Sequence, residues 1–87
     1  MRIGTKGTLE IGSDRYALRV VEQVNDKTFV AVHINDDGSC FTIGDGEQNL
    51  PWIEILRQKN DGEWYKGPTK HFRFREGEAV NYSDPEF

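Results

Sequence analysis

The chain has 87 residues, a length that predicts one domain with a thin core, because so short a chain buries only about 60% of its unfolded surface. Fifteen acidic against eleven basic residues give a net charge of −4, which disfavours indiscriminate binding to phosphate backbones. The sequence has no signal-peptide pattern and no apolar run of ~20 residues, and Cys40 is its only cysteine. We therefore expect a cytoplasmic protein without a membrane span, an intramolecular disulfide or a cysteine-based zinc site.

Short apolar runs rich in Val, Ile, Phe, Tyr and Thr recur with a period of two between clusters of Gly, Asn and Asp, which predicts strands joined by tight turns. Asn35-Asp36-Asp37-Gly38 and Asn60-Asp61-Gly62 are typical hairpin connections, because such residues tolerate positive φ or hydrogen-bond their own backbone. The pattern favours an all-β fold: a small, strongly bent antiparallel barrel or sandwich of the SH3-like kind, with about six to seven short strands. In chain order, the expected strands are 7–11, 15–24, 28–34, 39–43, 52–59, 63–66 and 70–75.

Alternation along these strands also predicts which side chains face the core. The second strand breaks the alternation, because Val20 and Val21 are adjacent and Val24 continues the earlier register, so we expect a bulge or sharp bend near Val21. Arg19, Glu54, His71 and Arg73 are expected on the opposite, outer face. The expected core side chains are Leu9, Ile11, Tyr16, Leu18, Val20, Ile53, Ile55, Phe72 and Phe74.

The single domain expected over residues 1–87 ends in a polar segment, 77–87. Two outcomes are open for this segment. Tyr82 and Phe87 could fold it back onto the barrel, or it forms a loose, frayed end.

The sequence offers little that could perform catalysis or bind a metal. His33 and His71 are the only histidines that could activate a nucleophile, and alternation places both opposite the core or near its edge. Cys40 follows a turn, where a small half-buried residue is the ordinary explanation. The acidic loops lack the Asp-x-Asp-x-Asp-Gly run of a calcium site. We therefore predict no enzyme, no catalytic residue, no cofactor and no metal site.

Two charged surfaces are candidates for binding. Asp36, Asp37, Asp45 and Glu47 could lie together at one end of the barrel and meet a basic surface of a partner protein. Alternatively, Lys66, Lys70, Arg73 and Arg75 alternate with aromatic residues in a basic arm, 66–75, as in proteins that bind single-stranded nucleic acid. An exposed strand edge could also form a homodimer.

Several fragments of the sequence resemble a group of small uncharacterised proteins of bacteriophages and plasmids. The resemblance is carried by Ser13-Asp14-Arg15-Tyr16-Ala17 leading into a strand, by the hairpin 57–64 with Asn60-Asp61-Gly62 and Trp64, and by the closing Tyr82-Ser83-Asp84-Pro85-Glu86-Phe87. It implies a mobile-element protein made in a bacterial cytoplasm, with no known enzymatic role.

Residues and resemblance together lead to two functional hypotheses. The first is a non-enzymatic protein-interaction module that binds a bacterial host protein and modulates or inhibits a host complex, as anti-defence proteins of phages do. The alternative is a small nucleic-acid-binding β-barrel that uses the basic arm.

Overall fold

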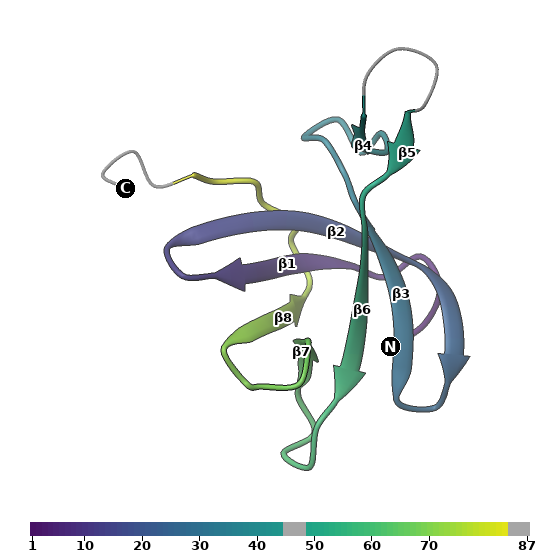
Figure 1. Ribbon diagram of the computed structural model, residues 1–87, viewed down its shortest axis with the longest axis vertical. Helices are drawn as coiled ribbons and strands as arrows, with labels where there is room; N and C mark the ends of the chain where they lie inside the picture. The colour runs from purple at the N-terminus through teal and green to yellow at the C-terminus, as the bar shows by residue number, and fades with distance from the viewer. Residues whose placement is uncertain (45–48, 84–87) are drawn as a thin grey trace.

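The computed structural model describes residues 1–44 and 49–83, and within them the chain forms eight strands. Six strands pair antiparallel into a closed barrel in the order β1-β2-β3-β6-β7-β8, which confirms the predicted small all-β barrel (Figure 1). The other two, β4 and β5, pair with each other in a separate arm. No helix among the described residues is long and apolar enough to cross a bilayer. The strands are β1 (Lys6–Ile11), β2 (Asp14–Asn25), β3 (Thr28–His33), β4 (Thr42–Ile43), β5 (Leu50–Pro51), β6 (Ile53–Gln58), β7 (Trp64–Lys66) and β8 (Phe72–Glu76).

The long strand β2 curves across the barrel and pairs with β1 at one end and β3 at the other (Figure 1). Its register with β3 shifts between Val20 and Glu22, which confirms the bulge expected near Val21. The extra residue leaves Val21 exposed while Val20 stays in the core. A bulge bends a strand and increases its twist, so the two ends of β2 point in different directions. One end can then pair with β1 and the other with β3.

The barrel closes where β1 pairs with β8, with Leu9 opposite Phe74 and Gly7 opposite Glu76. A Cβ atom on Gly7 would lie 2.3 Å from the carbonyl oxygen of Arg75 and 2.5 Å from the ring of Phe74, so only glycine fits at this contact. Closure gives every barrel strand two neighbours. Among the described strands, free edges therefore belong to the β4–β5 arm, and a homodimer through a strand edge stays a prediction.

The core confirms most of the expected inward side chains, but the phase predicted for β6 is wrong. Ile53 and Ile55 are 51% and 38% exposed, whereas Glu54 and Leu56 are buried. Alternation shows that every second residue of a strand faces the same way, but not which of the two sets faces inward. Pairing with β3 decides the phase, because Glu54 lies opposite Ala31 and Leu56 opposite Phe29. The buried core consists of Leu9, Leu18, Val20, Phe29, Ala31, Leu56, Trp64 and Phe74, with Ile11, Tyr16 and Phe72 packed against it.

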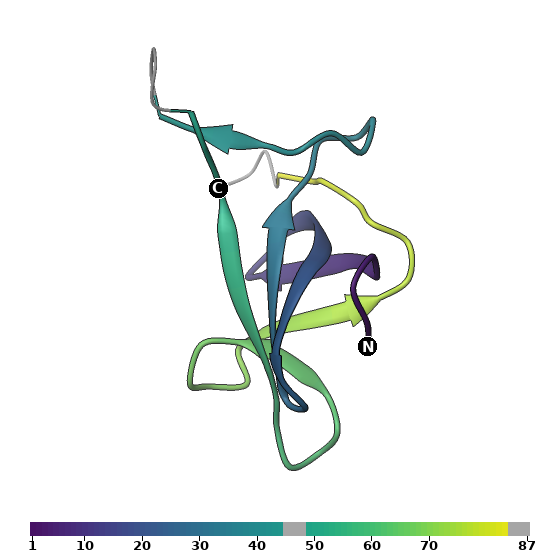
Figure 2. The same cartoon turned by 90° about the vertical axis from the view of Figure 1, so that its right-hand side faces the viewer.

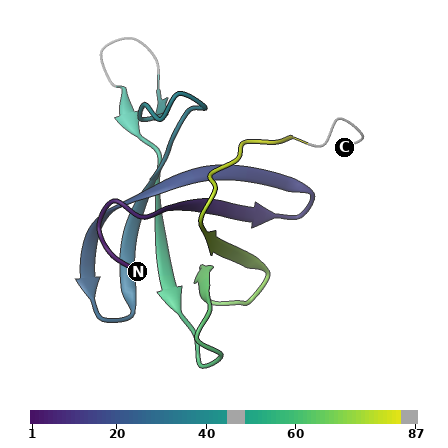
Figure 3. The ribbon, with the colours of Figure 1, turned by 180° about the vertical axis from the view of Figure 1, so that it is seen from behind.

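The segment after β8 folds back over the outside of β1 and β2 (Figure 3). Thr8 Oγ1 donates to the carbonyl of Glu78 (2.8 Å) and accepts the amide of Val80 (3.0 Å). Arg15 and Tyr82 exchange two backbone hydrogen bonds of 2.7 and 2.8 Å. As far as residue 83, the chain thus takes the folded-back alternative, and Phe87 lies outside the described residues.

Candidate functional site

The β4–β5 arm rises beyond one end of the barrel, on the continuation of β3 and β6 (Figures 1 and 2). Three backbone hydrogen bonds fix its foot: Phe41 donates to His33 (2.8 Å), His33 donates to Trp52 (2.8 Å), and Trp52 donates to Phe41 (3.2 Å). Phe41 and Trp52 flank the arm in sequence, so this pattern holds both aromatic side chains at the end of the barrel beside His33.

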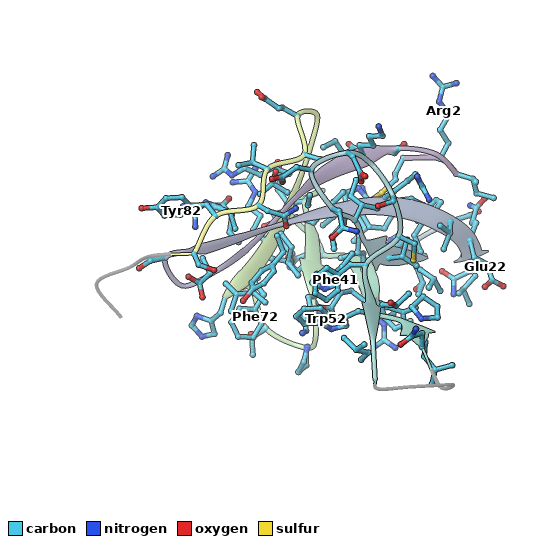
Figure 4. All side chains as sticks on the ribbon, turned by 90° about the horizontal axis from the view of Figure 1, so that it is seen from above. Arg2, Glu22, Phe41, Trp52, Phe72 and Tyr82 are labelled. Carbon is cyan, nitrogen blue, oxygen red and sulfur yellow. The ribbon has the colours of Figure 1, made fainter. Side chains whose placement is uncertain are left out.

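Next to the foot of the arm lies a cavity of about 300 Å³. The rings of His33 and Trp52 stack with centroids 3.7 Å apart and planes 8° from parallel. Tyr16 meets both rings edge-on, with ring centroids 5.4 and 5.7 Å away. Phe41 lies beside Trp52, with ring centroids 5.8 Å apart (Figure 4). The residues around the cavity are Tyr16, His33, Ile34, Asn35, Asp36, Phe41, Trp52 and Asn81.

Asn81, from the folded-back segment, joins three parts of the pocket wall. Its Oδ1 accepts the backbone amide of Ala17 (2.9 Å), and its Nδ2 donates to the carbonyl of Ile34 (2.9 Å) and to Oδ1 of Asp36 (3.2 Å). The segment after β8 therefore does more than cover the barrel, because it also helps to hold Asp36 at the pocket.

A buried carboxylate, that of Glu54, orients His33. Glu54 Oε2 lies 2.9 Å from His33 Nε2, and Lys66 Nζ lies 3.0 and 3.1 Å from the two Glu54 oxygens. Burial raises the pKa of Glu54, but hydrogen bonds from His33 and Lys66 outweigh burial and hold that pKa below its ordinary value. An ionised Glu54 only accepts hydrogen bonds, so it fixes the imidazole ring and, through stacking, the ring of Trp52.

Of the four acidic residues predicted to bind a partner, the structure brings Asp36 to the pocket. Asp37 lies beside it in the same exposed loop, and Asp45 and Glu47 fall outside the described residues. Asp37 Oδ1 accepts hydrogen bonds from the hydroxyl (2.6 Å) and the amide (2.9 Å) of Ser39. These bonds lower the pKa of Asp37 and keep it ionised.

Each cation of the predicted basic arm already has a carboxylate partner. Lys66 pairs with Glu54, and Lys70 with Asp61 at 3.5 Å. Arg73 pairs with Glu63 at 2.8 Å, and Arg75 with Glu10. A phosphate backbone would have to displace these carboxylates, which reduces the gain from neutralising phosphates.

The aromatic residues of the basic arm are no better placed for a nucleic acid. Phe74 and Tyr65 are buried, and Phe72 packs against the core. The Tyr65 hydroxyl donates to Asp61 (2.7 Å), which raises the pKa of Tyr65. These rings are therefore not presented to stack on bases.

The structure does not gather the residues considered for catalysis. His33, which alternation places opposite the core or near its edge, is instead buried and bonded to Glu54. Cys40 is exposed rather than half-buried, with its thiol 3.8 Å from the carbonyl of Phe41, and His71 is exposed on the loop before β8. In the part of the chain that the structure describes, no three His, Cys, Asp or Glu residues lie close enough to hold a metal.

Sequence reasoning missed the aromatic pocket itself. It assigned Tyr16 to the core and gave no site role to Phe41, Trp52 or Asn81, which reach the pocket from distant parts of the chain. One signal was available, because Phe41 and Trp52 stand at either foot of the irregular stretch 44–51 and would meet if that stretch formed a hairpin.

No protein-family model, curated protein or solved structure matches the chain. What the site can do therefore follows from its own residues.

Proposed function

We propose that this chain is a non-enzymatic protein-interaction module that binds its partner through the β4–β5 arm and the adjoining pocket. The observation that carries the proposal is the gathering of exposed apolar side chains on this arm. Phe41, Ile43 and Leu50 are 41%, 47% and 63% exposed, and Ile43 faces Leu50 across the arm. Exposed apolar surface of this kind, rimmed by polar residues, is typical of contact sites.

The acidic loop beside the arm supports selectivity for the partner. Asp36 and Asp37 are exposed at its tip, and an acidic rim favours partners with basic surfaces and raises their association rate. For the partner itself we propose a protein of a bacterial host, encountered in the cytoplasm. Modulation or inhibition of a host complex, as by an anti-defence protein, is the role that the resemblance to phage and plasmid proteins suggests.

Nucleic-acid binding through the basic arm is the weaker alternative, because Lys66, Lys70, Arg73 and Arg75 are all paired. We expect no gel shift with short single-stranded DNA or RNA at physiological salt. A shift that weakens steeply with salt and is lost in the double variant Lys70→Glu with Arg73→Glu would reverse this ranking.

Affinity capture from a bacterial lysate tests the leading proposal. The arm variant Ile43→Ser with Leu50→Ser is compared with a control, Ile3→Ser with Val24→Ser, which removes exposed apolar side chains away from the arm. We expect captured proteins to persist with the control and to be lost with the arm variant, while both variants keep the wild-type circular dichroism spectrum. If every captured protein persists with the arm variant, the arm is not the binding surface.

A further inference from the structure

We infer that the aromatic pocket is a receptor for one cationic side chain, a lysine or arginine of the partner. This inference rests on the proposed function and specifies what that surface recognises. It is built on the ring geometry, the charge at the pocket wall and the size of the cavity.

Four rings line the cavity: those of Tyr16, His33, Phe41 and Trp52. Tyr16 lies almost equally far from the centroids of His33 and Trp52, so it stands beside that stack and not over it. His33 covers one face of Trp52, and the ring of Phe41 lies 5.8 Å from Trp52, with its plane tilted by 57°. A cation within about 6 Å of the face of a tryptophan is attracted by the quadrupole of the ring, and Trp is the strongest of the aromatic residues in this respect.

The wall of the pocket carries one negative charge without a cationic partner among the described residues. Asp36 accepts the side-chain amide of Asn81 and forms no ion pair there. Lys6 and Arg19 do not line this cavity. Lys6 lines a second cavity whose wall also includes Asp36, without an ion pair between the two, and Arg19 donates to the carbonyl of Gly38 (3.1 Å). An arriving cation would thus meet aromatic rings and a carboxylate together.

The size of the cavity suits a single side chain. Its volume of about 300 Å³ is at the lower end of the range for small-molecule pockets, about 300–1,000 Å³. Ile34 and Phe41 offer apolar surface for the methylene stem of a lysine or arginine, while the charged head reaches the polar side of the pocket. A neutral aliphatic side chain would fill the same space but would form no ion pair with Asp36.

Capped tripeptides test the inference with the intact chain by nitrogen-15 NMR. Acetyl-Gly-Lys-Gly-amide, acetyl-Gly-Arg-Gly-amide and the neutral control acetyl-Gly-norleucine-Gly-amide are each titrated up to millimolar concentrations. We expect the lysine or arginine peptide to shift the indole N–H signal of Trp52. The indole signal of Trp64, which is buried in the core, should stay in place as an internal reference. A norleucine peptide that shifts Trp52 equally would overturn the inference, as would the absence of a shift with both cationic peptides.

Two conservative variants measure separately how much the carboxylate and an aromatic ring contribute to binding. Asp36→Asn should weaken the cationic peptide about threefold, the scale of an exposed ion pair. Asp37→Asn is the matched control, because Asp37 does not line the cavity, and it should weaken binding less. Phe41→Leu keeps the apolar bulk and removes a ring, so it should weaken binding about two- to fivefold. Equal effects of Asp36→Asn and Asp37→Asn would contradict a role for Asp36 in the pocket.

The two proposals fail in different ways. If the peptides leave Trp52 unchanged while lysate capture still depends on Ile43 and Leu50, the interaction module stands and its cation pocket does not. If the peptides bind but the arm variant captures as the wild type does, the pocket stands and the arm is not the contact surface.

Discussion

Replacing Glu54 by glutamine should remove the charge that binds His33 and Lys66, while keeping the shape of the side chain. One carboxylate serves two cationic or polar partners, His33 and Lys66, at 2.9–3.1 Å. A glutamine oxygen can accept from one of them, and its amide group then faces the other donor. Breaking a buried ion pair costs about 3–5 kcal/mol, but Lys66 is 34% exposed and recovers part of its hydration. We therefore expect Glu54→Gln to lower the free energy of unfolding by about 2–3 kcal/mol and the melting temperature by about 10–20 °C.

Urea denaturation followed by tryptophan fluorescence measures this loss. Glu63→Gln is the matched control, because it removes the exposed partner of Arg73 and should cost less than about 1 kcal/mol. Equal effects of the two substitutions, or a loss below about 0.5 kcal/mol for Glu54→Gln, would refute the view that this buried carboxylate organises the site.

The same comparison made across pH tests the sign of the pKa shift. The folded state holds the pKa of Glu54 below its ordinary value of 4.5, so the stability that Glu54 contributes is complete above pH 4.5. That contribution is lost as the pH falls through the lower, folded-state pKa. The difference in unfolding free energy between the wild type and Glu54→Gln should therefore narrow below pH 4.5. A difference that widens there would mean that the shift has the opposite sign.

Three further substitutions or treatments address the barrel and its covering. Gly7→Ala places a Cβ atom 2.3 Å from the carbonyl of Arg75 and should cost about 1–3 kcal/mol or more by urea denaturation, so a loss below about 0.5 kcal/mol would contradict the tight closure. Asn81→Ala removes three hydrogen bonds and should speed hydrogen exchange at the backbone amides of Arg15 and Tyr82, whereas unchanged exchange would show that Asn81 does not hold the segment. The exposed thiol of Cys40 should react with a disulfide reagent in the folded protein nearly as fast as in urea, and strong protection on folding would contradict its exposure.

The sequence predicts the barrel well because the signals for its strands and turns lie within short segments of the chain. Period-two alternation and turn residues locate the strands, and the adjacency of Val20 and Val21 locates the bulge without knowledge of any neighbour. The phase of β6 fails for the opposite reason. Ile53 and Ile55 together are more hydrophobic than Glu54 and Leu56, yet pairing with β3 turns Glu54 and Leu56 inward. The sequence of one strand does not show how it pairs with its neighbour.

The pocket could not be predicted from single-strand patterns either, because it also depends on which strands pair. Tyr16, His33 and Trp52 lie on or beside three different strands, and the pairing of β3 with β2 and with β6 brings their rings together. The sequence also does not show which charged side chains pair with one another in the fold. The basic arm resembles a nucleic-acid surface in the sequence, but the fold places Glu63, just before β7, beside Arg73 and Glu10 of β1 beside Arg75.

The junction of β1 with β8 also bears on how the chain folds as it is synthesised. The hairpins β1–β2 and β2–β3 can form on the ribosome soon after they emerge, because each joins segments adjacent in sequence. Leu9 has no Phe74 to pair with until translation reaches the last barrel strand. Until then, the apolar face of β1 lacks its partner in β8. Closing the barrel requires this pairing between strands distant in sequence, the kind of contact that slows the folding of β-rich domains to milliseconds or seconds.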